Sequence, residues 1–396
     1  MKDKKSIILY KSLMHYVKDT NHLAELCSKL NKSKFLAIDT EFIREKTYWP
    51  KLCLIQVFNG EDKIIIDPLA KELDLKPFFK ILGNNEIVKI FHSGRQDIEI
   101  FYNISGKIPQ PIFDTQIAAM VCGFGESVGY DKLVNKILNK KIDKSSRFSN
   151  WAKRPLTKKQ LNYAIGDVTF LYEIYPILNK EIKIKKREGW LDDELGVLLS
   201  KETYNSSPEI AYKRLKIRSY DIKTRAITFQ LALWREKKAQ SLDLPRGRVL
   251  SDEIIYELAS VKPKTINEIN NMRSFSNGYR LKEDVKQEIL DNILIGLTLR
   301  DKNLPRTPKR RILPHGTNSR VSLLKILLNS VSEQHDVAQK LIASARDLED
   351  LIANDDADIK TLKGWRYELF GKKALDFKNG KIAIIMNNNN IELKEL

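Results

Sequence analysis

The chain has 396 residues, with 69 Lys or Arg against 51 Asp or Glu, so its formal net charge is +18. Apolar residues make up 42% of it, enough for buried cores, and this length predicts two or three domains. The three cysteines, Cys27, Cys53 and Cys122, fit neither a disulfide framework nor a zinc pattern. No run is long enough to span a membrane, and the apolar stretch after the N-terminal lysines is too short for a secretion signal. We therefore expect a cytoplasmic protein.

The first half of the chain combines short apolar runs with longer amphipathic stretches. Three apolar runs in quick succession, followed by a fourth and then by helical patterns, predict a mixed sheet flanked by helices in an α/β domain. The expected strands are 34–42, 52–58, 63–67 and 87–91, and the expected helices are 113–122, 130–138, 158–178 and 193–204.

Four acids and a tyrosine occur at the ends of these elements. Asp39 and Glu41 lie two apart at the end of the first strand, so their side chains point to the same face. Asp97 lies near the start of the helix that follows the strand at 87–91. Thr157 and Gln160 form a capping box that starts the next long helix, and on it Tyr163 and Asp167 are four apart and share a face.

Clustered carboxylates repel each other unless a cation neutralises them or one keeps its proton. A set of hard oxygen ligands suits Mg²⁺ or Mn²⁺, and two such ions can clamp both the attacking and the leaving oxygen of a phosphoryl displacement. Each of these residues alone is more often structural than functional: a strand-end acid, a helix cap, a half-buried tyrosine or an exposed charge. Their order on these elements favours one metal-dependent site.

These segments resemble the DEDD exonuclease superfamily in its tyrosine-bearing branch, and within it the bacterial ribonuclease D family. The resemblance includes the sequences at 47–56, 91–92, 113–116 and 151–157 and extends over nearly the whole chain. It implies a ribonuclease H-like domain in which Asp39, Glu41, Asp97 and Asp167 hold two divalent ions. Tyr163 would position the attacking water. The implied reaction removes nucleotides stepwise from an RNA 3′ end as 5′-monophosphates, with transfer RNA precursors as substrates.

Other residues are candidates for contact with the substrate. Tyr48, Trp49 or Phe148 could stack on the terminal base, although aromatic residues in such places are more often part of a core. Thr40, Gln56 and His92 are further candidates, and His92 could equally be a packing or hydrogen-bonding residue. Asp114 is better explained as a helix N-cap than as a metal ligand.

Two positions depart from the family pattern. Asn150 stands where an acid is expected before Trp151. Gly166 replaces the alanine that the family tends to have before Asp167, and glycine inside a helix costs about 1 kcal/mol. Neither residue belongs to the set of five.

Strand patterns disappear beyond the break at 205–208. We expect an exonuclease domain at 1–205, a first helical domain similar to the HRDC (helicase and ribonuclease D C-terminal) module at 211–298, and a basic linker at 299–318. A second, divergent helical domain is expected at 319–380, followed by a frayed tail at 381–396. The helical domains could grip RNA or only stabilise the chain, and the linker could contact RNA or be a solvated connector.

Three functions remain open from the sequence. The first is a metal-dependent 3′→5′ exoribonuclease that acts as a monomer on RNA. The second is the same chemistry on DNA, and the third is a non-catalytic RNA-binding protein. The intact set of five argues against the third, and the helical domains favour RNA. The net charge adds little, because frequent Lys, Ile and Asn indicate a coding bias.

Overall fold

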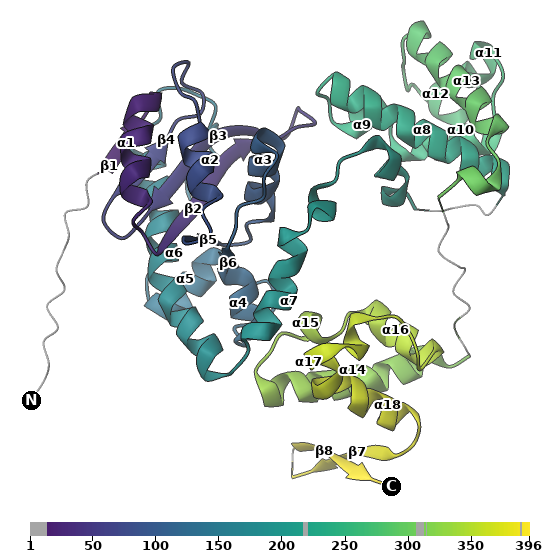
Figure 1. Cartoon of the computed structure of the whole chain (residues 1–396). Coiled ribbons are helices and arrows are strands. Elements are labelled where there is room, and N and C mark those ends of the chain that lie inside the picture. Colours follow the sequence, from purple (N-terminus) through teal and green to yellow (C-terminus); the bar gives the residue numbers. More distant parts are fainter. Residues whose placement is uncertain (1–13, 217–220, 306–312, 314, 389) are drawn as a thin grey trace, which may run out of the picture. The chain divides into compact units, whose positions relative to one another are not determined.

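The computed structural model describes residues 14–216, 221–305, 313, 315–388 and 390–396. The N-terminal segment 1–13 and part of the predicted basic linker, residues 306–312 and 314, lie outside the described residues. The chain divides into two compact units, shown in Figure 1. The first unit comprises Met1–Glu41, Leu52–Thr203 and Arg311–Leu396, and the second comprises Phe42–Lys51 and Tyr204–Arg310.

The first unit is built on a six-stranded mixed sheet, which confirms the predicted fold class. Its strand order is β1-β4-β3-β2-β5-β6. β1 pairs with β4, and β5 with both β2 and β6, in parallel, whereas β3 and β4 are antiparallel. Two short strands, β1 and β6, were not predicted. The strands are β1 Met14–Val17, β2 Phe35–Ile43, β3 Lys51–Phe58, β4 Lys63–Ile66, β5 Val88–Phe91 and β6 Ile112–Asp114.

Helices cover both faces of this sheet (Figure 1). On one face, the ring of Phe35 on β2 lies 4.5 Å from Tyr172 and 4.7 Å from Tyr175 of α6. On the other face, Phe91 on β5 contacts Phe101 of α3. Alternate residues of β2 therefore face α6 and α3. The helices are α1 Thr20–Leu30, α2 Lys76–Leu82, α3 Arg95–Ser105, α4 Thr115–Val121, α5 Tyr130–Leu138, α6 Lys158–Ile184 and α7 Glu188–Leu199.

The second helical region belongs to the same unit and packs on α4 and α7. Arg187 donates from Nη1 to the carbonyls of Val121 at 2.7 Å and Asp336 at 2.9 Å. Trp190 stacks on Trp365 with ring centroids 4.2 Å apart. This region contains α14 Thr317–His335, α15 Gln339–Ile342, α16 Ala345–Ala353, α17 Gly364–Arg366 and α18 Lys372–Lys378, with short 3₁₀ and π turns at Lys360–Leu362 and Tyr367–Gly371.

The prediction of a frayed tail at 381–396 was wrong. These residues form an antiparallel hairpin of β7, Ile382–Asn387, and β8, Asn390–Glu395. Asn388 adopts a left-handed φ of 46°, which asparagine tolerates better than most residues.

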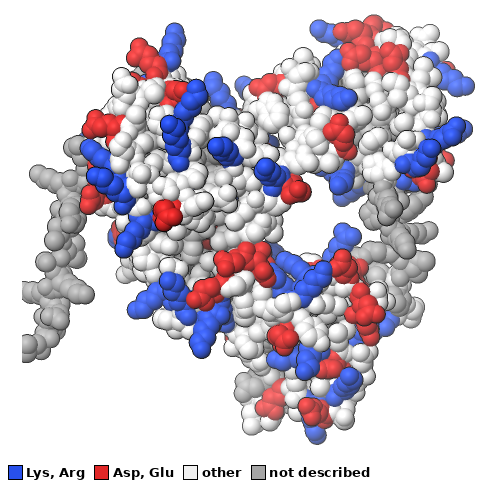
Figure 2. Space-filling model, in the orientation of Figure 1, with Lys and Arg blue, Asp and Glu red and all other residues white. Residues whose placement is uncertain are grey.

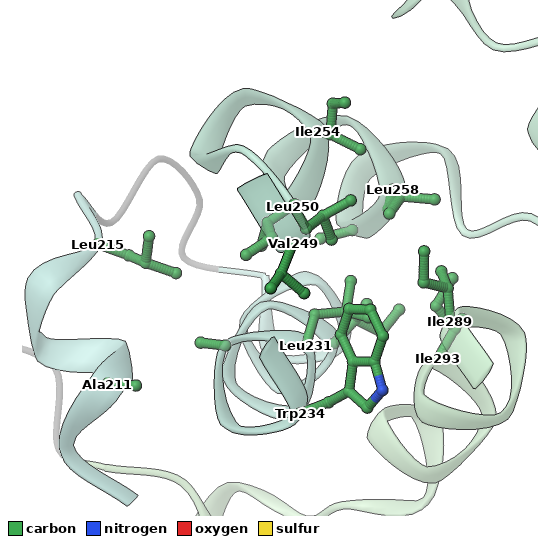
Figure 3. Close-up of a cluster of buried hydrophobic side chains, with 14 of the residues drawn as sticks. Ala211, Leu215, Leu231, Trp234, Val249, Leu250, Ile254, Leu258, Ile289 and Ile293 are labelled. Carbon is green, nitrogen blue, oxygen red and sulfur yellow. The ribbon is translucent and has the colours of Figure 1, made fainter. Parts of the chain in front are cut away.

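The second unit is an all-helical module with its own core. Side chains from α8, α10 and α13 meet in this core, among them Leu231, Leu258 and Ile293 (Figure 3). Its helices are α8 Ile222–Ser241, α9 Arg246–Val249, α10 Asp252–Val261, α11 Ile266–Asn270, α12 Arg273–Ser276 and α13 Glu283–Thr298. A short 3₁₀ segment at Lys201–Tyr204 belongs to the first unit up to Thr203. Two others, Pro208–Arg214 and Asp301–Asn303, lie in the second unit.

The segment between β2 and β3 is part of this helical core. Tyr48 is only 5% exposed, and its hydroxyl donates to the fully buried Glu236. Arg246 and Gln240 donate to the same hydroxyl at 2.8 and 2.9 Å. A domain boundary drawn at residue 205 therefore leaves out a segment that belongs to the second unit. Among the described helices, none combines the length and apolarity needed to cross a bilayer.

Candidate active site

Three predicted carboxylates meet between β2 and α6. Asp39, Glu41 and Asp167 each offer an oxygen, and these oxygens all lie within 4.8 Å of one another. The sequence explains the arrangement. Asp39 and Glu41 are on the face of β2 that Phe35 turns toward α6, and Asp167 lies on α6.

The electrostatics of the cluster are strained in the absence of a cation. Burial, followed by the charges of Asp97, Asp167 and Glu41, raises the pKa of Asp39 well above its usual value. Burial and the charge of Asp167 raise the pKa of Glu41 to about 9. Burial raises the pKa of Asp167 to about 7, although Tyr163 and Arg147 oppose this shift. The cluster therefore holds protons near neutral pH where free carboxyls would not.

Asp97, near the start of α3, is tied to β2 by hydrogen bonds and acts on the charge of Asp39. The hydroxyl of Thr40, between the two acids of β2, donates to Asp97. Burial raises the pKa of Asp97 to about 6, and the bond from Thr40 limits the rise. Its carboxylate is outside the group of three oxygen donors. We had predicted that Thr40 contacts the substrate, but its side chain is only 6% exposed and its hydroxyl orients Asp97.

The start of α3 is fixed by Asp114. Its side chain accepts from Gln116 and Ile117 at the start of α4, which confirms the predicted N-cap. It also accepts from the backbone N–H groups of Ser93 at 3.1 Å and Gly94 at 2.8 Å. One carboxylate thus fixes the turn that leads into the helix bearing Asp97.

Tyr163 lies beside the carboxylate cluster and is supported from the loop before α6. Its ring centroid is 6.0 Å from that of the buried Trp151. Arg154 holds this loop through a bidentate pair with Asp67, both bonds being 2.7 Å, and through a bond to the carbonyl of Trp151. Burial and the charge of Asp167 raise the pKa of Tyr163 far above 10, so its hydroxyl stays protonated and can donate.

The residues present suit a divalent cation. The donors are hard carboxylate oxygens, close together and half-buried, as Mg²⁺ and Mn²⁺ require. Arg147 is the cation that lowers the pKa of Glu41 and Asp167, and its effect is smaller than that of burial. A cluster with this much uncompensated repulsion is stabilised when a cation binds.

Several residues predicted to contact substrate have other roles. Tyr48 is buried in the helical core described above, and Trp49 packs against the same core. Gln56 on β3, another predicted substrate contact, is completely buried. His92 shares a 3.0 Å hydrogen bond with Thr115 and packs on Tyr130, which agrees with the packing alternative. Phe148 is the exception, because it is 92% exposed.

Two residues near the site were not anticipated from the sequence. Tyr130, the first residue of α5, donates its hydroxyl to the carbonyl of Asp167. Arg147 acts on Glu41 and Asp167 from an exposed loop. Both effects join segments 20 or more residues apart, so no local pattern could reveal them.

The two departures from the family pattern are structurally mild. Asn150 accepts a 3.1 Å bond from the backbone N–H of Ala152, as an aspartate would. A Cβ added at Gly166 meets nothing within 4 Å. Alanine would therefore fit at position 166.

Comparison with known proteins agrees with this geometry. A 3′→5′ exonuclease family model matches residues 14–183, and an HRDC domain model matches residues 225–282. The chain is 40% identical over 389 residues to ribonuclease D of Bartonella henselae, covering 98% of this chain and 95% of the relative. The chain belongs to the ribonuclease D family. A relative from Nitrobacter hamburgensis is 42% identical over 94% of this chain and 97% of its own length.

A solved structure of a ribonuclease D also matches this chain. The crystal structure of Escherichia coli RNase D superposes with a TM-score of 0.79 at 29% identity, covering 93% of this chain and 99% of that one. As a ribonuclease D family member with a 3′→5′ exonuclease domain, the protein is a hydrolytic 3′→5′ exoribonuclease. The acidic cluster is consistent with the divalent metal use that this type of domain implies.

Proposed function

We propose that this protein trims 3′ extensions from transfer RNA precursors, using Asp39, Glu41, Asp97 and Asp167 to hold two Mg²⁺ or Mn²⁺ ions. The observation that carries the proposal is the meeting of three carboxylates within 4.8 Å beside Tyr163. When bound, the ions would neutralise the cluster, activate a water and stabilise negative charge on the departing 3′ oxygen.

The chain's own residues would prepare the reaction. Thr40 and Asp114 keep Asp97 in place through the hydroxyl bond and the turn before α3. Tyr163, protonated at neutral pH, would hold the attacking water by a hydrogen bond and fix its direction toward the terminal phosphate. Arg147 would place positive charge beside the phosphate as negative charge builds up on its oxygens.

The other parts of the proposal concern the helical regions, the RNA substrate and the setting. We assign the helical regions at 211–298 and 319–380 as two HRDC-like modules that help to grip RNA; the HRDC match at 225–282 supports the first. The E. coli structure is described as an exoribonuclease involved in structured RNA processing, which supports a structured RNA substrate here. Three buried free cysteines support action in the reducing cytoplasm, and we propose a monomer.

The test is digestion of a 5′-labelled transfer RNA precursor with a 3′ extension, beside an unstructured RNA and a DNA strand of equal length. The proposal predicts a metal-dependent ladder that shortens from the RNA 3′ end and stops near the mature end of the transfer RNA. Equal rates on the precursor and the unstructured RNA would contradict the proposed substrate. Equal rates on DNA would contradict the restriction to RNA.

A further inference from the structure

The net charge of the protein does not by itself locate an RNA surface. On the face drawn in Figure 2, Lys and Arg side chains are interspersed with Asp and Glu. A local excess of positive charge near the acidic cluster is more informative. Residues 131–147 contain six Lys or Arg and two Asp, a net charge of +4 in 17 residues.

This excess surrounds a hollow on the surface of the exonuclease domain. The hollow has a volume of about 530 Å³ and lies between α5 and the segment that follows it. Its lining residues are Asp131, Lys132, Asn135, Lys136, Lys140, Lys141 and Ile142. Lys132 and Lys141 are exposed, and neither forms an ion pair with a described carboxylate. Three of the four lysines in this lining, Lys132, Lys136 and Lys141, form no ion pair with a described carboxylate, so an anion is the ligand that would stabilise them.

Contacts on α6 place the hollow beside the active site. α5 begins at Tyr130, which bonds to the carbonyl of Asp167. Just beyond its end, Lys140 pairs with Glu173 at 2.6 Å. Asp167 and Glu173 are six residues apart on α6, a rise of about 9 Å. This is roughly three nucleotides of a stacked single strand, at about 3.4 Å each.

The chain then returns from the hollow to the acidic cluster. Lys144 pairs with Asp131 at 2.6 Å, which brings the loop back to the start of α5. Three residues later, Arg147 acts on Glu41 and Asp167, and its guanidinium lies 5.4 Å from the ring centroid of Phe148. Phe148 is 92% exposed and three residues before Trp151, which packs on Tyr163. Three residues of extended chain span about 10 Å, so Phe148 lies within this distance along the chain from Trp151, which supports Tyr163.

We propose that the lysine-lined hollow binds backbone phosphates of single-stranded RNA about three nucleotides upstream of the 3′ end, and that Phe148 stacks on a base between the hollow and the acidic cluster. This inference rests on the proposed function, because cleavage from the 3′ end requires that the 3′ end of the strand lies at the acidic cluster. The path accounts for an exposed aromatic ring and a hollow with unpaired lysines, Lys132 and Lys141, on one continuous segment. Lysine contacts to phosphate are independent of sequence, and stacking accepts any base, as a trimming enzyme needs.

The test separates binding from catalysis. Lys132→Gln/Lys141→Gln and Phe148→Ala are each introduced into the Asp39→Asn background, and the Kd of a fluorescein-labelled 12-nucleotide RNA is measured by anisotropy at several salt concentrations. Glutamine keeps the length of the side chain and removes its charge. Lys80→Gln/Lys107→Gln, which removes two exposed lysines on α2 and after α3, is the matched control.

The proposal predicts that the hollow variant raises the Kd of the 12-nucleotide RNA about tenfold at 0.15 M salt. The slope of log K against log salt concentration becomes shallower by about 1.4, because each of the two lost phosphate contacts contributes about 0.7. Its Kd for a dinucleotide stays unchanged, because a dinucleotide does not reach the hollow. Phe148→Ala raises the Kd of both RNAs at least fivefold, and Phe148→Trp restores the original Kd. A hollow variant that behaves as the control does, or a Phe148→Ala variant with unchanged Kd, overturns the path. A wild-type protein that binds along this path but does not shorten RNA contradicts the proposed function and leaves the path standing.

Discussion

Replacing Asp39 by asparagine should abolish RNA cleavage and, without divalent ions, make the protein more stable than the wild type. Two unit charges 4.8 Å apart repel by about 3.5 kcal/mol at an effective dielectric constant of 20, and Asp39 has two such neighbours, Glu41 and Asp167. Burial, together with this repulsion, raises the pKa of Asp39, so the folded protein keeps a proton on the cluster. Asparagine removes one charge and the need for that proton.

The sign of the pH dependence follows from proton linkage. Because the folded-state pKa of Asp39 is raised, the unfolded chain binds fewer protons above about pH 4, and the stability of the wild type falls as pH rises. One proton changes the free energy of unfolding by about 1.4 kcal/mol per pH unit. The stability advantage of Asp39→Asn should therefore grow as the pH rises from 5 to 8.

The assay is urea unfolding of both proteins with chelator at each pH, repeated with saturating Mn²⁺. Metal should restore the stability of the wild type more than that of the variant, because the variant lacks one ligand. Asp192→Asn, which changes an exposed carboxylate on α7, is the control and should give no pH-dependent gain. A constant difference between Asp39→Asn and wild type from pH 5 to 8 would refute the account of a strained cluster.

Three further outcomes are expected. Tyr163→Phe should slow turnover at least tenfold and leave Mn²⁺ affinity, measured by calorimetry, unchanged, because the hydroxyl orients water and the carboxylates hold metal; equal loss of both would make the tyrosine structural. Gly166→Ala should raise stability by roughly 0.5–1 kcal/mol with activity retained, since its Cβ has free space in the helix; a lower melting temperature would show a clash. Tyr48→Phe should destabilise the helical unit by about 1–3 kcal/mol, because Glu236 loses a buried hydrogen bond; weaker RNA binding at unchanged stability would instead restore Tyr48 as a substrate contact.

Local periodicity was enough to predict the central part of the site. The two-residue spacing of Asp39 and Glu41 and the four-residue spacing of Tyr163 and Asp167 each fix a shared face once the element type is known. The caps at Asp114 and Thr157 were equally local, and the structure confirms both. The order of the strands in the sheet was not predicted.

The features that the sequence analysis missed depend mostly on contacts between residues far apart in the chain. Tyr48 looked like an exposed aromatic near the site, but a buried carboxylate 188 residues away takes its hydroxyl. Gln56 looked polar enough to face a ligand, yet it is enclosed by the sheet layers. The tail at 381–396 was misjudged because an alternating pattern was overlooked beside a low-complexity asparagine run.

The measurement that tests the central claim most directly is the analysis of the product released from an unlabelled RNA in H₂¹⁸O with Mg²⁺, by mass spectrometry. If the acidic cluster directs water at the terminal phosphate, the product is a nucleoside 5′-monophosphate with one ¹⁸O, and Asp39→Asn releases none. A 3′-phosphate or cyclic phosphate, or full release by Asp39→Asn, would contradict the account.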